Sequence, residues 1–255
     1  MIQQAAIAQP TGEETFIGHL VELRNRMVKA AIGVAIVCGV LFFWPGPAEI
    51  YDFLAAPMLA SLPTGAKMIA TGVTAPFLVP MKVTLMLALL VALPWVFYQV
   101  WGFVAPGLYA HEKRLVLPLV FSSSVLFVAG TAFCYFLVFG RVFHFISTFA
   151  PASIAVTPDI ENYLDFVMSM CLAFGAAFEV PVVVVILVRM GLVSVEKLKS
   201  IRSYVIVGAF VIAAVVTPPD VVSQLALAVP MALLFELGVL LAPVFVRATR
   251  APQEA

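Results

Sequence analysis

The stretch FVMSMCLAFGAAFEVPVVVVILV, residues 166–188, is long and apolar enough to cross a lipid bilayer as a helix. Its single charged residue is Glu179. A charged group at such a depth costs about 2.5–3.5 kcal/mol on insertion scales, so it usually faces a protein interior, a water cavity or a partner. The stretch therefore predicts a membrane protein that makes a polar contact inside the membrane.

The composition of the whole chain supports this class. Of its 255 residues, 63% are hydrophobic and 11% are charged, and the mean hydropathy is +1.10. A soluble domain is typically about 25% charged. The formal net charge is zero and the chain has no Lys/Arg tract, which argues against nucleic-acid binding. Residues 1–15 are polar and acidic, so no cleavable signal peptide is expected.

Six apolar stretches are expected to cross the membrane, the last two as a hairpin. They are residues 28–44, 77–97, 115–140, 163–189, 204–216 and 221–246. The fifth stretch gives only about 20 Å of helix against about 30 Å of hydrocarbon, which predicts a local distortion of the bilayer or a tilted hairpin. The fold class is thus an all-α membrane protein. We expect one polytopic domain over 1–255, with a polar tail at 1–15, a core at 16–246 and a short tail at 247–255.

Two structural residues are expected on the side opposite the termini. In the hairpin turn TPPD, residues 217–220, the prolines end one helix and Asp220 is placed to cap the next. Between the first two crossings, apolar residues at helical spacing predict a short amphipathic helix lying over the outer face, with its pattern broken at Pro57. These apolar residues are Ile50, Phe53, Leu54 and Met58.

The distribution of basic residues predicts the orientation. Eleven of the fourteen lysines and arginines fall on one side of the six crossings, and the positive-inside rule makes that side cytosolic. Lys67 and Arg141 lie on the other side, and Lys82 lies inside the second crossing, from where it snorkels toward that side. We therefore expect a multi-pass protein of the inner (cytoplasmic) membrane with both termini in the cytosol. The eleven residues are Arg24, Arg26, Lys29, Lys113, Arg114, Arg189, Lys197, Lys199, Arg202, Arg247 and Arg250.

No pattern in the chain indicates an enzyme, a metal site or a cofactor. The three histidines are far apart and no HExxH occurs, so a zinc site has no support. Cys38, Cys134 and Cys171 lie in apolar stretches without a CxxC pair and are expected to be buried hydrophobic residues. The run at 122–124, three serines, is interpreted as small-residue helix packing. Any work must therefore draw on a partner or on an ion gradient.

Two carboxylates at the cytosolic edge, Glu22 and Glu112, have simple structural interpretations. Glu22 lies four residues before Arg26, and such a helical pair contributes only about 0.2–0.5 kcal/mol. Glu112 is consistent with a solvated charge in a loop. Composition alone favours these readings over a binding role.

Several motifs, in order over residues 15–246, resemble the TatC family, the integral membrane receptors of twin-arginine protein translocases. One departure is Lys113, where many relatives have Arg, so the charge is kept but the guanidinium is lost. The motifs are FIGHLVELRNR (16–26), MIAT (68–71), YQVW (98–101), FVAPGLY (103–109) with HE (111–112), AFGAAFEVP (173–181), VGAF (207–210) and TPPDV (217–221).

The resemblance implies a cup-shaped, six-helix fold that binds the signal peptides of folded cargo proteins on its cytosolic face through two adjacent arginines. It implies that Glu22 and Glu112 accept the two arginines, with Arg24 and Phe103 shaping the site. It also implies oligomeric assembly with further copies and with the single-span subunits TatA and TatB, and transport driven by the proton-motive force. Two carboxylates can distinguish arginine from lysine by geometry, because a guanidinium offers up to five fixed N–H donors.

For Glu179 the resemblance implies a polar contact in the concave interior with TatA, TatB or the signal peptide. Burial in apolar surroundings favours its neutral form, which can donate as well as accept a hydrogen bond. Two other classes stay open. A proton-coupled solute transporter would use Glu179 as its proton carrier, and a structural scaffold for other membrane subunits would need no arginine recognition.

Overall fold

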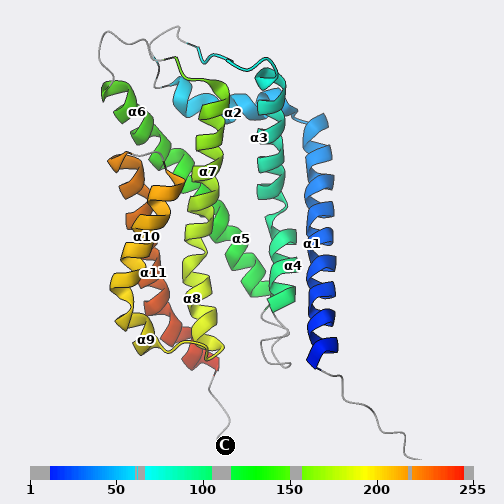
Figure 1. Ribbon diagram of the computed structural model, residues 1–255, viewed down its shortest axis with the longest axis vertical. Helices are drawn as coiled ribbons and strands as arrows, with labels where there is room; N and C mark the ends of the chain where they lie inside the picture. The colour runs from blue at the N-terminus through cyan, green and yellow to red at the C-terminus, as the bar shows by residue number, and fades with distance from the viewer. Residues whose placement is uncertain are drawn as a thin grey trace, which may run out of the picture.

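The computed structural model describes residues 12–60, 62, 67–104, 116–149, 157–217 and 220–249. Most of its helices run along the long axis of the molecule, whereas α2 lies across one end (Figure 1). The elements are α1 (Gly12–Phe43), α2 (Pro47–Leu59), α3 (Ala75–Val91), α4 (Leu93–Val104), α5 (Val116–Phe133), the π-helical segment η3 (Cys134–Val138), α6 (Phe139–Phe149), α7 (Ile160–Phe178), α8 (Val180–Arg189), α9 (Val195–Ser200), α10 (Arg202–Val216) and α11 (Val221–Thr249).

The described residues contain four helices that are long and apolar enough to cross a membrane. These spans are Ile17–Phe43, Val116–Ile146, Ile160–Arg189 and Val221–Val244. The bent pair α3–α4 gives a fifth span if it is counted as one. The remaining expected crossing corresponds to α10, a shorter apolar helix of 15 residues. The protein is thus an all-helical membrane protein with four to five apolar spans.

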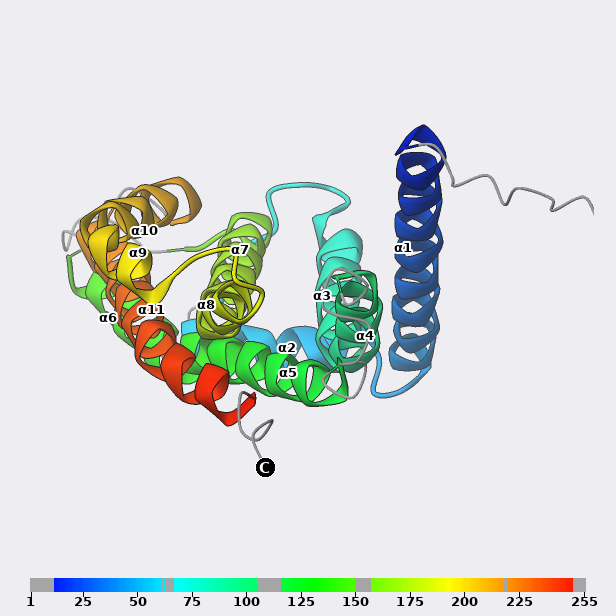
Figure 2. The same cartoon turned by 90° about the horizontal axis from the view of Figure 1, so that it is seen from below.

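Seen from below, the helices form a row with α1 at one end and the α10–α11 pair at the other (Figure 2). α1 packs on α3 and α4, α11 packs on α8 and α10, and α5 crosses between α4 and α7. In the most apolar part of its span, Ile17–Phe43, α1 has no residue buried inside the protein. Large apolar side chains such as Ile36 and Val40 are more than 60% exposed there, as expected for a surface that faces lipid.

Prolines break two of the expected single helices. α3 and α4 meet at an angle of 58° around Ala92, next to Pro94. α7 and α8 meet at Glu179, and Pro181 lies in the first turn of α8. A proline removes a backbone donor and clashes with the preceding turn, so both breaks have a local cause. Glu179 therefore lies at a break in its span, and its N–H bonds to Ala176 O at 3.1 Å.

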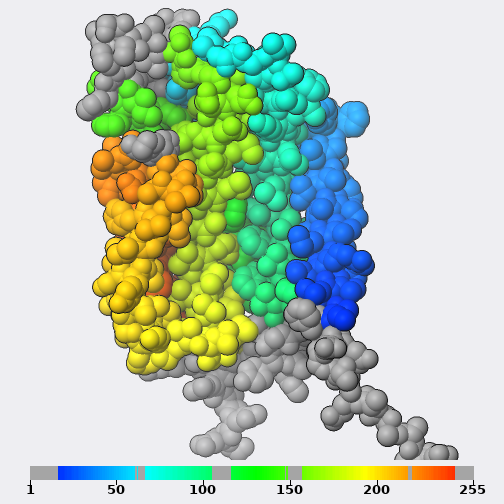
Figure 3. Space-filling view, in the orientation of Figure 1, coloured from blue at the N-terminus to red at the C-terminus, as the bar shows by residue number. Residues whose placement is uncertain are grey.

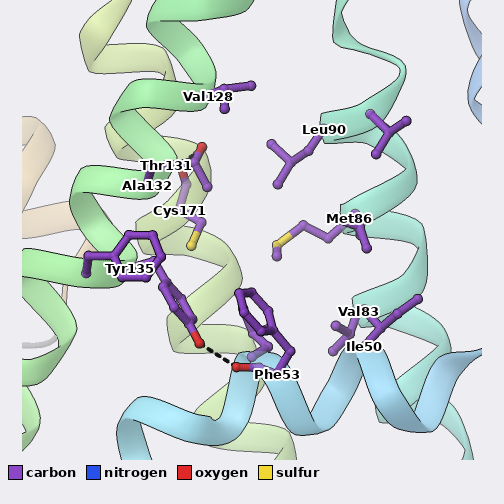
Figure 4. Close-up of a pocket in the computed structure, with 14 residues that line it drawn as sticks. Ile50, Phe53, Val83, Met86, Leu90, Val128, Thr131, Ala132, Tyr135 and Cys171 are labelled. Atoms are coloured by element: carbon purple, nitrogen blue, oxygen red, sulfur yellow. Dashed lines mark hydrogen bonds between the residues drawn. The ribbon is translucent and has the colours of Figure 1, made fainter. Parts of the chain in front are cut away.

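The expectation that Pro57 interrupts the amphipathic helix is wrong, because α2 continues through Pro57 to Leu59. Pro57 cannot donate to the carbonyl of Phe53, four residues earlier. The hydroxyl of Tyr135 in η3 donates to that carbonyl instead (Figure 4). The hydroxyl of Tyr163 likewise donates to Leu54 O at 2.8 Å. Two tyrosines from distant helices thus hold α2 in place across the end of the bundle.

The segments before α3 and α7 are joined at the same end as α2. Ile69 N donates to Pro158 O and Ile160 N donates to Ile69 O, both at 2.9 Å. Asp159 begins α7 as its N-cap and also binds Thr71. Two connections that are about ninety residues apart in sequence therefore form one cap over this end.

Candidate functional site

The two ends of the bundle differ in charge. The end where α1 begins and α9 lies, at the bottom of Figure 1, is named the basic end. The end covered by α2, at the top, is named the acidic end. The described basic end holds Arg24, Arg26, Lys29, Arg189, Lys197, Lys199 and Arg202, whereas Glu49, Asp52, Asp159, Glu161 and Asp165 lie on elements of the acidic end.

A cavity of about 660 Å³, named the α1–α4 pocket, opens between these two helices at the basic end. In the space-filling view α1 lies against the side of α3 and α4 (Figure 3). The lining combines charged, amide, aromatic and small groups, so it suits a ligand with both polar and apolar parts. The lining residues are Gly18, Val21, Glu22, Asn25, Arg26, Lys29, Trp95, Tyr98 and Gln99.

Within this pocket, Glu22 is paired with Arg26 of the same helix. Arg26 Nε and Nη2 donate to Glu22 Oε1 at 2.9 and 2.7 Å. The Arg26 and Glu22 side chains are 25% and 37% exposed, so the pair is partly shielded from solvent. The predicted pairing of Glu22 with Arg26 is therefore present in this structure. A binding role would have to use a carboxylate that is already engaged.

Of the other predicted binding residues, the structure describes Phe103 and Arg24. The Phe103 ring of α4 contacts the His19 ring of α1, with centroids 4.6 Å apart. Arg24 is exposed and donates to Asn25 Oδ1 at 3.2 Å. Glu112 lies outside the described residues. The structure thus brings Glu22 and Phe103 to one end of the α1–α4 contact.

Trp95 closes the pocket from α4. Its Nε1 donates to Lys29 O at 2.8 Å, and its ring packs so tightly against Gly33 that a side chain at Gly33 would overlap it. Sequence reasoning missed this residue, because a tryptophan in an apolar run has no signal that separates it from lipid-facing aromatics. The consequence is a fixed separation between α1 and α4 beside the charged pair.

Glu179 occupies a second polar site inside the bundle. Its carboxyl lies beside the hydroxyl of Ser123 in α5, and Ser123 accepts a hydrogen bond from Trp101 Nε1 of α4 at 3.1 Å. Among the described residues, Glu179 Oε1 is buried and has no hydrogen-bond partner. A buried unpaired oxygen is costly, so it marks a place where a further donor would be stabilised.

The structure adds a polar contact to the predicted small-residue helix packing of the 122–124 serines. Ser122 and Ser124 do bond only within their own helix here, to Leu119 O and Val120 O. Ser123 is fully buried and links Trp101 to Glu179. Sequence reasoning missed Ser123 and Trp101 because their connection joins three helices that are distant in the chain.

Asp220 stands where its capping role was predicted. Its Oδ1 accepts from the Ser223 backbone N–H at 2.7 Å, in the first turn of α11. Glu236, also in α11, forms an ion pair with Arg202 of α10, with Nη2 and Oε2 2.7 Å apart. Asp220 therefore caps α11 at the hairpin turn, and the Arg202–Glu236 ion pair ties α10 to α11.

Lys82 does not lie free in its span. Its Nζ is 3.4 Å from Glu161 Oε1 and 3.7 Å from Asp165 Oδ1, both on α7 at the acidic end. These side chains are between 42% and 62% exposed, so the contacts are weak ones. No group of three potential metal ligands occurs in the part of the chain that the structure describes.

The fold and these sites define a multi-pass helical membrane protein with a polar pocket at its basic end and a carboxyl inside its bundle. The model of the Sec-independent protein translocase protein (TatC) family matches residues 18–230. The chain therefore belongs to the TatC family. Family membership makes it a component of a Sec-independent protein translocase rather than an enzyme.

Individual relatives agree with this assignment. The TatC protein of Azotobacter chroococcum mcd 1 is 50% identical over 234 residues, which cover 91% of each chain. That of Escherichia coli K12 is 46% identical over 241 residues, 94% of this chain and 93% of the relative. A crystal structure described as the twin arginine translocase receptor TatC is 37% identical, with a TM-score of 0.77, covering 91% of this chain and 100% of that one.

Proposed function

We propose that this chain is the receptor subunit that binds twin-arginine signal peptides of folded cargo proteins. The observation that supports this most is the α1–α4 pocket, which places a carboxylate next to aromatic and amide groups at the basic end. A signal peptide with arginines beside an apolar segment has the matching chemistry. Glu22 and Glu112 accept the two arginines, and Arg24 and Phe103 shape the site.

The proposed recognition depends on the geometry of the cargo side chains. Each guanidinium donates two parallel N–H groups to a carboxylate, whereas a lysine ammonium acts as a point charge. Arg26 already donates two N–H groups to Glu22 in this pocket. The space beside the Glu22 carboxylate is therefore large enough for a guanidinium. Replacing the cargo arginines by lysine should therefore not be a conservative change.

In the proposed orientation the basic end faces the cytosol, six helices cross the inner membrane and both termini are cytosolic. The chain assembles with further copies of itself and with the single-span subunits TatA and TatB. Transport draws on the proton-motive force. The excess of basic residues at one end and of acidic residues at the other supports this orientation.

Glu179 is proposed to contact a polar group of TatA, TatB or the signal peptide. Its unpartnered Oε1 inside the bundle supports this role. We expect Glu179→Gln to retain most transport, because an amide keeps hydrogen-bonding capacity, and Glu179→Ala to lose it. The measurement is export of a reporter cargo by cells that carry each variant at equal membrane levels. Equal loss in both variants would contradict this role.

The receptor proposal is tested by binding of labelled signal peptides to the purified protein in detergent. We expect an Arg-Arg peptide to bind at least about tenfold more tightly than a Lys-Lys peptide, since hydrogen bonds to charged groups contribute about 1.5–3 kcal/mol. Glu22→Ala and Glu112→Ala should each remove this preference. Glu196→Ala is the matched control, because Glu196 is an exposed carboxylate of α9 outside the pocket. Equal binding of both peptides to the unmodified chain would refute the proposal.

A further inference from the structure

The carboxylate that the proposed receptor offers to its cargo is not vacant. Arg26 places both its Nε and its Nη2 on the same oxygen, Glu22 Oε1, at 2.9 and 2.7 Å. This arrangement uses two of the guanidinium's five donors and satisfies one carboxylate oxygen twice. An arginine of the cargo would offer the same kind of N–H donors to the same carboxylate.

The Arg26 guanidinium packs against helix α4 at Gly102. A Cβ atom built on Gly102 would overlap Arg26 Nη1 and lie 3.2 Å from Arg26 Cζ. The guanidinium therefore lies directly against the Gly102 backbone, in space that only glycine leaves open. Arg26 thus reaches from α1 to α4 while it holds Glu22, and this position is favoured by both contacts.

We propose that Arg26 is a resident competitor that occupies the Glu22 subsite until a cargo arginine displaces it. This inference rests on the proposed receptor function. The exchange replaces one guanidinium by another, so the carboxylate in this partly shielded pocket is paired both before and after the cargo binds. A receptor without cargo therefore presents an ion pair of zero net charge, rather than an open carboxylate, to the cytosol. A peptide must compete with Arg26 for Glu22, so peptides that bind weakly are excluded.

The competition has a definite thermodynamic signature. The apparent dissociation constant equals the intrinsic constant divided by the fraction of receptor in which Glu22 is free. Weakening the Arg26 contact raises that fraction and tightens binding. The same factor applies to every peptide that uses Glu22, so the ratio between Arg-Arg and Lys-Lys affinities stays constant. A residue that merely supported the fold would weaken binding when it is changed.

The experiment measures dissociation constants of both labelled peptides for the full-length protein in detergent. The variants Arg26→Gln and Arg26→Lys remove the guanidinium, the latter with the charge retained. Gly102→Ala keeps both Arg26 and Glu22 in the sequence but fills the space against α4 that the Arg26 guanidinium occupies. The matched control is Gly208→Ala, since Gly208 has nothing within 4 Å of its Cβ position. Thermal unfolding of each variant verifies folding, and Gly102→Ala provides the test independently if the Arg26 variants fail to fold.

We expect Arg26→Gln and Gly102→Ala to bind the Arg-Arg peptide about two- to fivefold more tightly, on the scale of a partly exposed ion pair. Arg26→Lys should bind more tightly by a smaller factor, and Gly208→Ala should bind like the unmodified protein. Adding Glu22→Gln to Arg26→Gln should abolish the gain in affinity, because the carboxylate that Arg26 releases to the cargo arginine is then absent.

Unchanged or weaker binding in Arg26→Gln and Gly102→Ala would overturn the competitor role. So would a collapse of the preference for Arg-Arg, which would instead assign Arg26 a direct contact with the cargo. Glu22→Gln alone separates the two proposals. If it weakens binding while the Arg26 variants do not tighten it, the receptor site stands and the competitor fails. If it has no effect, the receptor site itself is wrong.

Discussion

The Asp159 carboxylate joins two segments of the acidic end through four hydrogen bonds. Its Oδ2 accepts from the Thr71 hydroxyl and backbone N–H at 2.7 and 2.9 Å. Its Oδ1 accepts from the N–H groups of Glu161 and Asn162 at 3.0 and 3.1 Å. The Thr71 hydroxyl is the main cause that lowers the pKa of Asp159 from 3.8 to about 2, and the backbone donors add to it. Asp159 thus both caps α7 and links it to the segment before α3.

We expect Asp159→Asn to lower the melting temperature in detergent at neutral pH. Because the folded pKa is depressed, the stabilisation is complete above the ordinary value of 3.8 and is lost as the pH falls to about 2. The decrease should be at most about 2–4 °C, because asparagine still accepts as an N-cap and only the charge and one acceptor oxygen are lost. The variant and the unmodified protein should converge near pH 2. Glu49→Gln, an exposed carboxylate of α2, serves as control.

At this scale, local signals in the sequence were sufficient for some residues only. The capping role of Asp220 follows from the turn sequence around it, and the Glu22–Arg26 pair follows from helical spacing. Neither the bond from Tyr135 to Phe53 O nor the link from Trp101 through Ser123 has a local signal. Those bonds join residues whose proximity depends on how the helices cross.

Two glycines let α5 and α7 cross at close range. A Cβ on Gly130 of α5 would come within 2.5 Å of Phe174 O, a backbone atom of α7. A Cβ on Gly175 of α7 would overlap the Phe127 ring of α5. Small residues at such positions let helix backbones approach closely in a membrane. These two glycines therefore fix how near α7, and with it Glu179, lies to Ser123.

Gly130→Ala should destabilise the protein by about 1–3 kcal/mol, the usual cost of overpacking a close contact. The reason is that backbone atoms of α7, unlike a flexible side chain, cannot move aside. Gly140→Ala provides the control in the same span, because Gly140 has nothing within 4 Å of its Cβ position. Melting in detergent measures the difference. Equal stability of both variants would show that the two helices separate without cost.

The elements also show where patterns in the chain mislead. The six apolar stretches all correspond to helices, since hydropathy alone specifies them. The breaks at Ala92 and Glu179 were signalled by Pro94 and Pro181 but were not predicted, because a proline in a membrane helix bends it only when its neighbours allow. Pro57 was predicted to break the helical pattern of this segment, but α2 continues through it, and Tyr135 replaces the missing donor at Phe53 O.

An apolar groove between helices is a feature of the whole molecule that the sequence did not predict. It has a volume of about 420 Å³ and lies between α3 and α5, above α2 (Figure 4). Met86, Leu90 and Cys171 line it from two sides. The groove depends on the angle between α3 and α5. No single apolar stretch predicts it, because its lining residues come from several helices.

The whole molecule is asymmetric in the depth of its helices. α10 has 15 residues, about 22 Å of helix, whereas the α7–α8 span has 30 residues. In Figure 1 the upper end of α10 lies below the level of α2. A hairpin of this length either reaches the outer surface through a thinned bilayer or ends within the membrane. The position of the termini cannot separate these cases, since both leave the C-terminus on the basic side.

Cysteine labelling of the hairpin turn separates them and tests the six-crossing topology. Val221, 70% exposed at the start of α11, is changed to Cys and treated in intact cells with a membrane-impermeant maleimide. We expect labelling without permeabilisation, as for Glu49→Cys on α2, whereas Lys199→Cys on α9 should require permeabilisation. The unmodified chain measures the background from the native cysteines, of which Cys134 and Cys171 are buried whereas Cys38, predicted to be buried, is only half-buried. If Val221→Cys stays unlabelled while Glu49→Cys reacts, the hairpin ends inside the membrane, and α10 does not cross it.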